Sequence, residues 1–459
     1  MNVLSQDKQA QWVPVRESKA TRGDFPQILE QCPSPAGAAR AAAWVMALLR
    51  SIAHRPLQRL CADPVHRPPR RLCTNPTGGV PYPPSPSPSC GSTSPTGGVP
   101  IPAITESILR QRWTDLDPEA DRILEVLHAS DAPLIWHKHS SFLDHLREVW
   151  VILCTWQQPR DTCRLGLLHS AYSNSFVSMN CFDPKRDRGR VAELIGSDAE
   201  NLVYKFCSID RQKFEETVLN ERTVRRGGYT LQHIHTKEML TVSGNEAAAF
   251  VTETLADELD QRFGWQSELE VGATAACWPG PSQPTLRLGR TSQLARALRE
   301  SGLVDESALP PIFGRCSRVL SEPDERAARG SYWEAATLGG LAPTAARERS
   351  VAQVRLLAAA SHCNPFVAEP HVVRAQCLLQ LGQWDEAADA AAHGVRLLCE
   401  LGTNWDKRMP YNAWLNWARC LGLQAALKEW PQTHGGIESL GATMPRMRFR
   451  GLNTERSMA

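Results

Sequence analysis

The stretch that decides the fold runs from His137 to Arg211. It contains HKHSSFLDHLREVWVILCTW (residues 137–156), GLLHSAYSNSF (residues 166–176) and DAENLVYKFCSIDR (residues 198–211). Apolar residues in these segments recur every three to four positions, which is typical of helices that bury one face. The sequence therefore predicts a mostly α-helical fold that places histidines and a carboxylate on successive helices.

The same periodicity extends on both sides of this stretch. Ser141 and Asp161 stand where residues that cap helix N-termini are expected. After Gly227-Gly228 the residues alternate between apolar and polar, which indicates a short β-hairpin. The predicted helices cover residues 109–129, 140–156 (or from 133), 161–172, 191–210 and 244–263, and the hairpin covers residues 229–242.

Residues 1–102 have a different composition from the rest of the chain. They hold 17 of its 33 prolines and two copies of a short repeat, NPTGGVPYP at Asn75–Pro83 and SPTGGVPIP at Ser94–Pro102. Proline lacks the amide hydrogen that helices and sheets need, and such Pro-rich repeats are low-complexity sequence. We therefore predict a disordered N-terminal segment, with folded structure beginning near Ile104.

The C-terminal part is predicted to be helical over residues 291–430, between a Gly/Pro-rich linker at 267–290 and a tail at 431–459. One block within it, residues 368–401, resembles a tetratricopeptide repeat in its small and large apolar positions: Ala375, Gly382, Trp384, Ala387 and Ala391. About three such repeats are needed for a stable stack. The neighbouring segments, 331–360 and 406–427, are therefore expected to supply helices that complete a tetratricopeptide-like array, and such an array would bind a protein or peptide partner.

Composition excludes several classes of protein. The formal net charge of +2 gives no strong nucleic-acid signal, and no apolar run is long enough to span a bilayer. None of the 14 cysteines forms a CxxC pair, so we expect reduced cysteines in a cytoplasmic protein. An Arg-flanked apolar segment at Ala41–Leu49 leaves organelle targeting as an alternative.

A candidate metal site follows from two histidines and a later carboxylate. His145 and His169 lie 24 residues apart on adjacent predicted helices, each on an apolar face. Imidazoles and carboxylates that converge from several helices are the ligands of divalent metals. The third ligand is Asp210 or, as the alternative, Asp257. Without a metal, both histidines would be ordinary core residues.

The wider pattern of DHL, GLLHSAY, AENLVYKFCSIDR and LADELDQ resembles an uncharacterised HD-like domain family related to the HD superfamily of metal-dependent phosphohydrolases. The resemblance covers about residues 113–266 and, more loosely, residues 310–430, and it implies an HD-like helical bundle over residues 104–266. It implies that His145 and His169 are metal ligands, followed by Asp210 or Asp257. Ser170 stands where the superfamily has an Asp that can bridge two metals. Two histidines and one aspartate remain enough for a single ion.

Candidate substrate contacts lie close to the histidines in sequence. Tyr172 could orient a substrate or water, and Lys185, Arg186 and Arg211, together with Arg188, are the nearest cations for a phosphate. The alternative is that the basic run is a solvated loop. His137, His139, His233 and His235 are substitute ligands, although we interpret the last two as solvated hairpin residues.

Two functions are consistent with these patterns. The first is a metal-dependent phosphohydrolase with a variant His-Ser site, which would act on a phosphorylated small molecule. The second is a non-catalytic interaction protein, in which a degenerate HD-like domain precedes a tetratricopeptide-like binding region. Metal content would discriminate between them.

Overall fold

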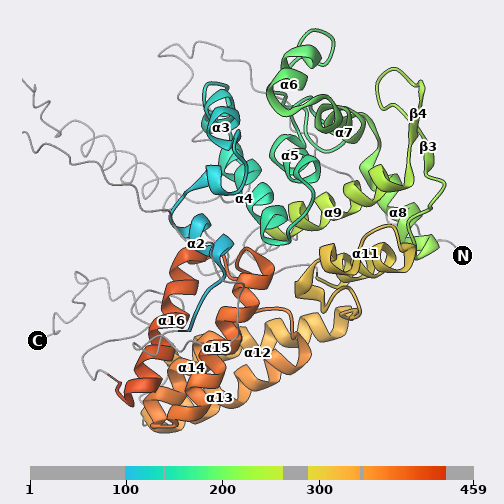
Figure 1. Ribbon diagram of the computed structural model, residues 1–459. Coiled ribbons are helices and arrows are strands. Elements are labelled where there is room, and N and C mark those ends of the chain that lie inside the picture. Colours follow the sequence, from blue (N-terminus) through green and yellow to red (C-terminus); the bar gives the residue numbers. More distant parts are fainter. Residues whose placement is uncertain (1–98, 138–139, 262–287, 342–345, 431–459) are drawn as a thin grey trace, which may run out of the picture. The chain divides into compact units, whose positions relative to one another are not determined.

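The structure is a computed structural model that describes residues 99–137, 140–261, 288–341 and 346–430. The chain divides into a unit of residues 1–88 and a unit of residues 89–459, and all described residues belong to the second. The predicted disordered segment, the linker up to residue 287 and the tail at 431–459 lie outside the described residues, apart from residues 99–102. The fold of the described residues is mostly helical, as predicted (Figure 1).

The first part of the described chain carries the predicted metal-site residues. Its helices are α2 (Ala103–Leu109), α3 (Ala120–His128), α4 (Phe142–Thr155), α5 (Arg160–Leu168), α6 (Arg188–Ile195), α7 (Ser197–Ser208), α8 (Arg211–Glu221) and α9 (Gly244–Gln261). Single-turn 3₁₀ helices lie at Trp113–Asp115 and Ala132–Leu134. The antiparallel hairpin of β3 (Tyr229–Gln232) and β4 (Met239–Val242) confirms the predicted one. A second hairpin, β1 (Trp136–His137) with β2 (Ser140–Ser141), was not predicted.

The α4 helix begins where its sequence predicts. The Ser141 hydroxyl accepts a hydrogen bond from the Asp144 amide at 3.1 Å, which satisfies one of the free amides of the first turn. Along the helix, Phe142, Leu146, Val149 and Leu153 are all buried. The apolar positions that the periodicity predicted to be buried are therefore buried in the structure.

Three predicted helices differ from the observed ones. The expected helix at 109–129 is interrupted, because Asp117 is held in a buried ion pair with Arg164 (2.7 Å) and the following Pro118 disfavours helical backbone at Asp117. The expected helix at 191–210 is two helices, since Gly196 adopts φ 90° between them, a conformation open mainly to glycine. The helix expected at 161–172 ends at Leu168, and Asp161 does not cap it.

The α4 and α5 helices approach each other closely at Gly166. A Cβ atom there would lie 2.3 Å from Leu153 Cδ1 and 3.2 Å from Val149 Cγ1. Only glycine therefore fits without a shift in α4. This contact brings the end of α5, where His169 lies, against the helix that carries His145, and α9 packs on both helices.

The second part begins with α11 (Leu288–Ser301), which starts inside the segment predicted as a linker and packs on α8 and α9. The helices α12 to α16 follow, each packed on the next (Figure 1, orange to red). Their bounds are Glu322–Leu341, Ala346–Cys363, Glu369–Leu381, Trp384–Leu401 and Tyr411–Leu427, and single-turn 3₁₀ helices lie at Glu306–Ala308 and Pro311–Phe313. We call α12 to α16 the C-terminal array.

The block predicted as one repeat is the helix pair α14 and α15. Gly382 joins the two helices with φ 76°, and Gly394 allows a close approach, because a Cβ there would lie 2.8 Å from Val372 Cγ2. The small residues therefore lie at the turn and at the contact between the helices, as the sequence predicts. The block is therefore a pair of packed helices, and its likeness to a tetratricopeptide repeat stays a prediction.

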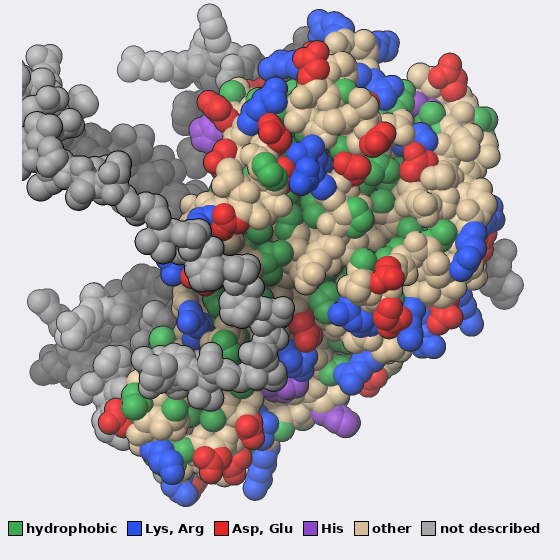
Figure 2. Space-filling model, viewed as in Figure 1, with side chains coloured by type: hydrophobic (Ala, Val, Ile, Leu, Met, Phe, Trp, Pro, Cys, Tyr) green, Lys and Arg blue, Asp and Glu red, His purple; other side chains and the backbone are tan. Residues whose placement is uncertain are grey.

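None of the described helices combines the length and apolar character that a bilayer-spanning segment needs. On the face shown in Figure 2, Lys and Arg side chains are interspersed with Asp and Glu side chains. Large aromatic residues instead fill the core, where Trp150, Trp156, Trp405 and Trp414 are almost fully buried.

Candidate metal centre

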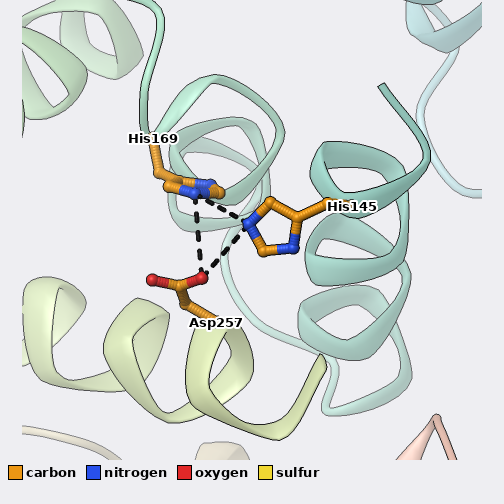
Figure 3. A group of neighbouring side chains, drawn as sticks. All are labelled: His145, His169 and Asp257. Carbon is orange, nitrogen blue, oxygen red and sulfur yellow. Dashed lines mark hydrogen bonds and ion pairs between the residues drawn. The ribbon is translucent and has the colours of Figure 1, made fainter. Parts of the chain in front are cut away.

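Three side chains from three helices converge on one point (Figure 3). His145 Nε2 lies 3.2 Å from His169 Nε2 and 3.2 Å from Asp257 Oδ1, and His169 Nε2 lies 3.8 Å from the same oxygen. A point about 2.0 Å from all three atoms exists in a triangle with these sides. That is the distance at which zinc binds histidine and carboxylate ligands.

The other nitrogen of each imidazole fixes which atom faces this point. His145 Nδ1 donates to Asp260 Oδ2 at 2.7 Å, and His169 Nδ1 donates to the Gly166 carbonyl at 2.8 Å. Nε2 is therefore the nitrogen that faces the common point in both rings, and it is free to bind a metal when the imidazole is neutral. Hydrogen bonds of this kind orient metal-binding histidines and raise their basicity.

One face of α9 supplies three carboxylates that lie close to the histidines. Glu253, Asp257 and Asp260 lie at spacings of four and three residues, which places them on the same side of a helix. Asp257 faces both imidazoles, Asp260 contacts His145, and Glu253 Oε1 lies 3.4 Å from His169 Nδ1. All three side chains are buried.

Arg211 holds the outer oxygen of Asp257. Its guanidinium donates to Asp257 Oδ2 at 2.8 Å and lies 3.5 Å from Glu253 Oε2. Burial raises the pKa of Asp257, but His169, Arg211 and His145 outweigh it and bring the pKa well below its ordinary value. Asp257 is therefore an ionised candidate ligand. Its Oδ2 atom accepts a hydrogen bond from Arg211, and its Oδ1 atom faces the two histidines.

The pKa values of the two histidines are shifted in opposite directions. Burial lowers the pKa of His145, but Asp257 and Asp260 together raise it to about 9. Burial also lowers the pKa of His169, to about 4. The difference between the two pKa values reflects the carboxylates that face each ring, because His145 contacts both Asp257 and Asp260.

Asp210 is not part of this group. It caps the N-terminus of α8 by accepting a hydrogen bond from the Lys213 amide at 3.2 Å, and it forms an ion pair with the Lys213 side chain. Of the two candidates, the structure brings Asp257, the alternative, to the histidines and places Asp210 elsewhere. An aspartate directly before a helix is first of all a capping residue.

Ser170 has a structural role in the loop after His169. Its hydroxyl accepts a hydrogen bond from Asn174 Nδ2 at 2.8 Å. The Asn174 Oδ1 atom in turn accepts from the Phe176 amide at 2.8 Å and from the Val177 amide at 3.0 Å. Ser170 is thus buried in a hydrogen-bonded turn.

Tyr172 and Arg188 both bind Glu200. Tyr172 donates its hydroxyl proton to Glu200 Oε1 at 2.9 Å, and Arg188 forms a bidentate pair with the same carboxylate at 2.7 Å. Burial raises the pKa of Tyr172 well above its ordinary value. These contacts connect α7 to α6 and to the segment that follows α5.

Lys185 and Arg186 lie on an exposed turn around Asp183. The Lys185 amide donates to Asp183 Oδ1 at 2.8 Å, and the Arg186 side chain pairs with Asp183 Oδ2 at 2.8 Å. Arg211, by contrast, is buried against Asp257. Substrate binding by Tyr172, Lys185 and Arg186 stays a prediction, whereas Arg211 contacts a candidate ligand directly.

Three of the four substitute histidines lie among the described residues. The His137 ring lies 4.5 Å from the His145 ring, centroid to centroid, so β1 borders the site. The interpretation of the hairpin histidines as solvated fits His235, which is exposed, but is wrong for His233, which is buried. His233 Nδ1 accepts hydrogen bonds from the amides of His235 and Thr236 in the β3–β4 turn. His139 lies outside the described residues.

Sequence reasoning missed Glu253 and Asp260, as well as the role of Arg211. The signal was present as the pattern E-x3-D-x2-D on an apolar helix, at Glu253, Asp257 and Asp260. Three acids on the buried face of one helix require partners. That requirement points to nearby histidines or cations.

The comparison with known protein families gave a match that includes the stretch from His137 to Arg211. Residues 126–211 match a family described as "Domain of unknown function (DUF6817)". The matched segment contains His145 and His169 but not Asp257. No curated protein and no solved structure matches the chain at a significant level. The match does not extend to the C-terminal array. No match to the HD superfamily or to a tetratricopeptide family was found.

Proposed function

We propose that His145, His169 and Asp257 bind one divalent metal ion, and that this centre belongs to a hydrolase-like domain. The observation that carries the proposal is the convergence of two Nε2 atoms and one carboxylate oxygen around a point about 2.0 Å from each. Two histidines and one carboxylate leave further coordination positions for water and substrate.

A metal in this centre would supply a bound water of lowered pKa and polarise a phosphoryl oxygen. The protein's own groups would orient the ligands: Asp260 and the Gly166 carbonyl fix the imidazoles, and Arg211 fixes Asp257. We propose a phosphomonoester of a small molecule as the substrate class. Serine at position 170 supports one metal rather than two, because a hydroxyl engaged with Asn174 adds no bridging carboxylate.

A non-catalytic role is the second candidate, because the predicted phosphate contacts have other partners. Arg211 pairs with Asp257, Arg188 with Glu200, and Arg186 with Asp183. The side chains of His145 and His169 are each 2% exposed, and that of Asp257 is 6% exposed. A metal buried to this degree could stabilise the fold while the C-terminal array binds a protein or peptide.

Metal stoichiometry of the purified full-length chain tests the metal centre. We expect about one equivalent of metal per chain, strongly reduced in His145→Ala and His169→Ala. His235→Ala is the matched control, because His235 is exposed in the β3–β4 turn. Metal content that is negligible, or equal in all four proteins, contradicts the proposal.

Hydrolysis of an aryl phosphate separates the two candidates. The metal-loaded chain should release phosphate, and His169→Gln should abolish this release. A chain that binds one metal through these residues and releases no phosphate favours the non-catalytic role.

A further inference from the structure

Lys407 reaches the metal centre from the C-terminal array, more than a hundred residues after the last candidate ligand. Its ammonium nitrogen lies 3.8 Å from Asp260 Oδ1, and the Lys407 side chain is only 5% exposed. The other oxygen of Asp260 binds His145 Nδ1 at 2.7 Å. Lys407, Asp260 and His145 therefore form a continuous chain of charged and polar groups that ends at the candidate metal.

Several hydrogen bonds hold the loop that carries Lys407. Lys407 Nζ donates to Thr403 Oγ1 at 2.7 Å. Glu369 Oε1 accepts hydrogen bonds from the amides of Trp405 (2.6 Å) and Asp406 (3.1 Å). Asn404 Nδ2 donates to the carbonyls of Asp406 and Met409. These hydrogen bonds tie the loop between α15 and α16 to α14 and orient the Lys407 side chain.

The same end of α15 is docked on the helix that carries His145. Trp156 Nε1 donates to the Glu400 carbonyl at 2.9 Å. Gly402, at φ 75°, is so close to α4 that a Cβ atom there would lie 3.0 Å from Thr155 Oγ1 and 3.3 Å from Ile152 Cα. Two contacts shortly before Lys407 in the chain, at Glu400 and Gly402, therefore fix the end of α15 against α4.

A buried lysine next to a buried carboxylate needs that partner, since a buried charge without compensation is strongly unfavourable. The pairing restrains the Asp260 carboxylate, and a restrained carboxylate keeps the imidazole of His145 in the orientation that metal binding requires. Charge alone would act in the opposite sense, because an ammonium group repels a divalent cation.

We propose that Lys407 is a positioning residue of the metal centre, so that the C-terminal array completes the site. This inference rests on the proposed metal centre. The C-terminal array would then support the metal centre in addition to any role in binding a partner. Because coupling between sites is reciprocal, metal binding and the docking of the α15–α16 loop stabilise each other.

Zinc affinity of the full-length chain, measured by competition with a chromophoric chelator, tests this assignment. Lys407→Met should weaken zinc binding about 10-fold, the lower end of the effect of outer-shell changes. Lys407→Arg, which keeps the charge, should lie closer to wild type. The matched control is Lys213→Met, because the Lys213 side chain is 82% exposed.

Asp260→Asn provides the second test. If Lys407 acts through Asp260, Lys407→Met should have no further effect on zinc affinity in the Asp260→Asn background. Hydrogen exchange provides a readout that does not depend on the zinc affinity: zinc should slow amide exchange in residues 402–410 of wild type but not of Lys407→Met.

The outcomes separate the two proposals. If His145→Ala abolishes zinc binding while Lys407→Met binds zinc as tightly as wild type or more tightly, the metal centre stands and the assignment of Lys407 is overturned. An effect of Lys407→Met that persists undiminished in Asp260→Asn also overturns it. A wild-type chain that binds no zinc overturns both.

Discussion

Replacing Arg211 by methionine should destabilise the metal-free protein by about 3 kcal/mol. Arg211 is 3% exposed and its guanidinium lies 2.8 Å from Asp257 and 3.5 Å from Glu253. Removing one partner of a buried ion pair costs about 3–5 kcal/mol. We expect the lower value, because His145 lies 3.2 Å from Asp257 Oδ1 and is protonated in the metal-free protein.

Urea unfolding followed by circular dichroism, with a chelator and with saturating zinc, measures this effect. A bound metal would supply positive charge beside Asp257, so the loss in unfolding free energy should be smaller with zinc than with chelator. Arg186→Met is the control: that side chain is 80% exposed, and its removal should change stability by about 0.5 kcal/mol or less.

Unchanged stability of Arg211→Met would refute this reasoning. If Arg211→Met unfolds at the same urea concentration as wild type but loses phosphate release, Arg211 contacts the substrate rather than supporting Asp257. That result would restore the interpretation made from the sequence, in which Arg211 binds a phosphate.

Three further predictions follow from single contacts. Asp257→Asn should lose most zinc binding, whereas Asp210→Asn should keep it and lose only about 1 kcal/mol of stability as a helix cap; equal zinc binding in both variants would contradict the choice of Asp257. Burial raises the pKa of Glu369 to about 7, so its contribution to stability is full below the unfolded pKa of about 4.5 and is lost as the pH rises through 7. Wild type should therefore lose more unfolding free energy than Glu369→Gln between about pH 5 and pH 8, and parallel urea-unfolding profiles would show the pKa to be normal. Gly402→Ala should destabilise the protein by at least about 1–2 kcal/mol, given the left-handed backbone and the contact with α4, whereas Gly330→Ala, whose added Cβ meets nothing within 4 Å, should be neutral or stabilising in the same assay.

Local signals were sufficient to predict several elements of the fold. Ser141 marked the start of α4, and Gly227-Gly228 preceded a real hairpin. These features depend on residues close in sequence, so periodicity and capping chemistry describe them well. The break at Gly196 was harder to predict, because a glycine inside an apolar pattern is often tolerated within a helix.

The two histidines were easier to find than their carboxylate partner. His145 and His169 lie on apolar faces of neighbouring helices, so packing those faces brings them together. Asp210 and Asp257 both follow at plausible distances along the chain, and spacing alone does not distinguish them. The difference is local: Asp210 directly precedes a helix and caps it, whereas Asp257 lies on the buried face of α9 between Leu255 and Leu259.

Lys407 could not be found from the sequence. It lies in a loop 147 residues after Asp260, and no periodicity connects the two positions. Its place is set by the docking of α15 on α4 through Trp156 and Gly402. Contacts of this kind depend on tertiary packing, which a single sequence does not encode in any local pattern.

The X-ray absorption spectrum of the chain loaded with one equivalent of zinc tests the central claim most directly. We predict nitrogen and oxygen ligands at about 2.0–2.2 Å, with outer-shell scattering from two imidazoles and no sulfur. One imidazole should disappear from the spectrum of His169→Gln, and both should remain in that of Asp210→Asn. Sulfur scattering at about 2.3 Å, or a spectrum unchanged by His169→Gln, would contradict a metal centre formed by His145, His169 and Asp257.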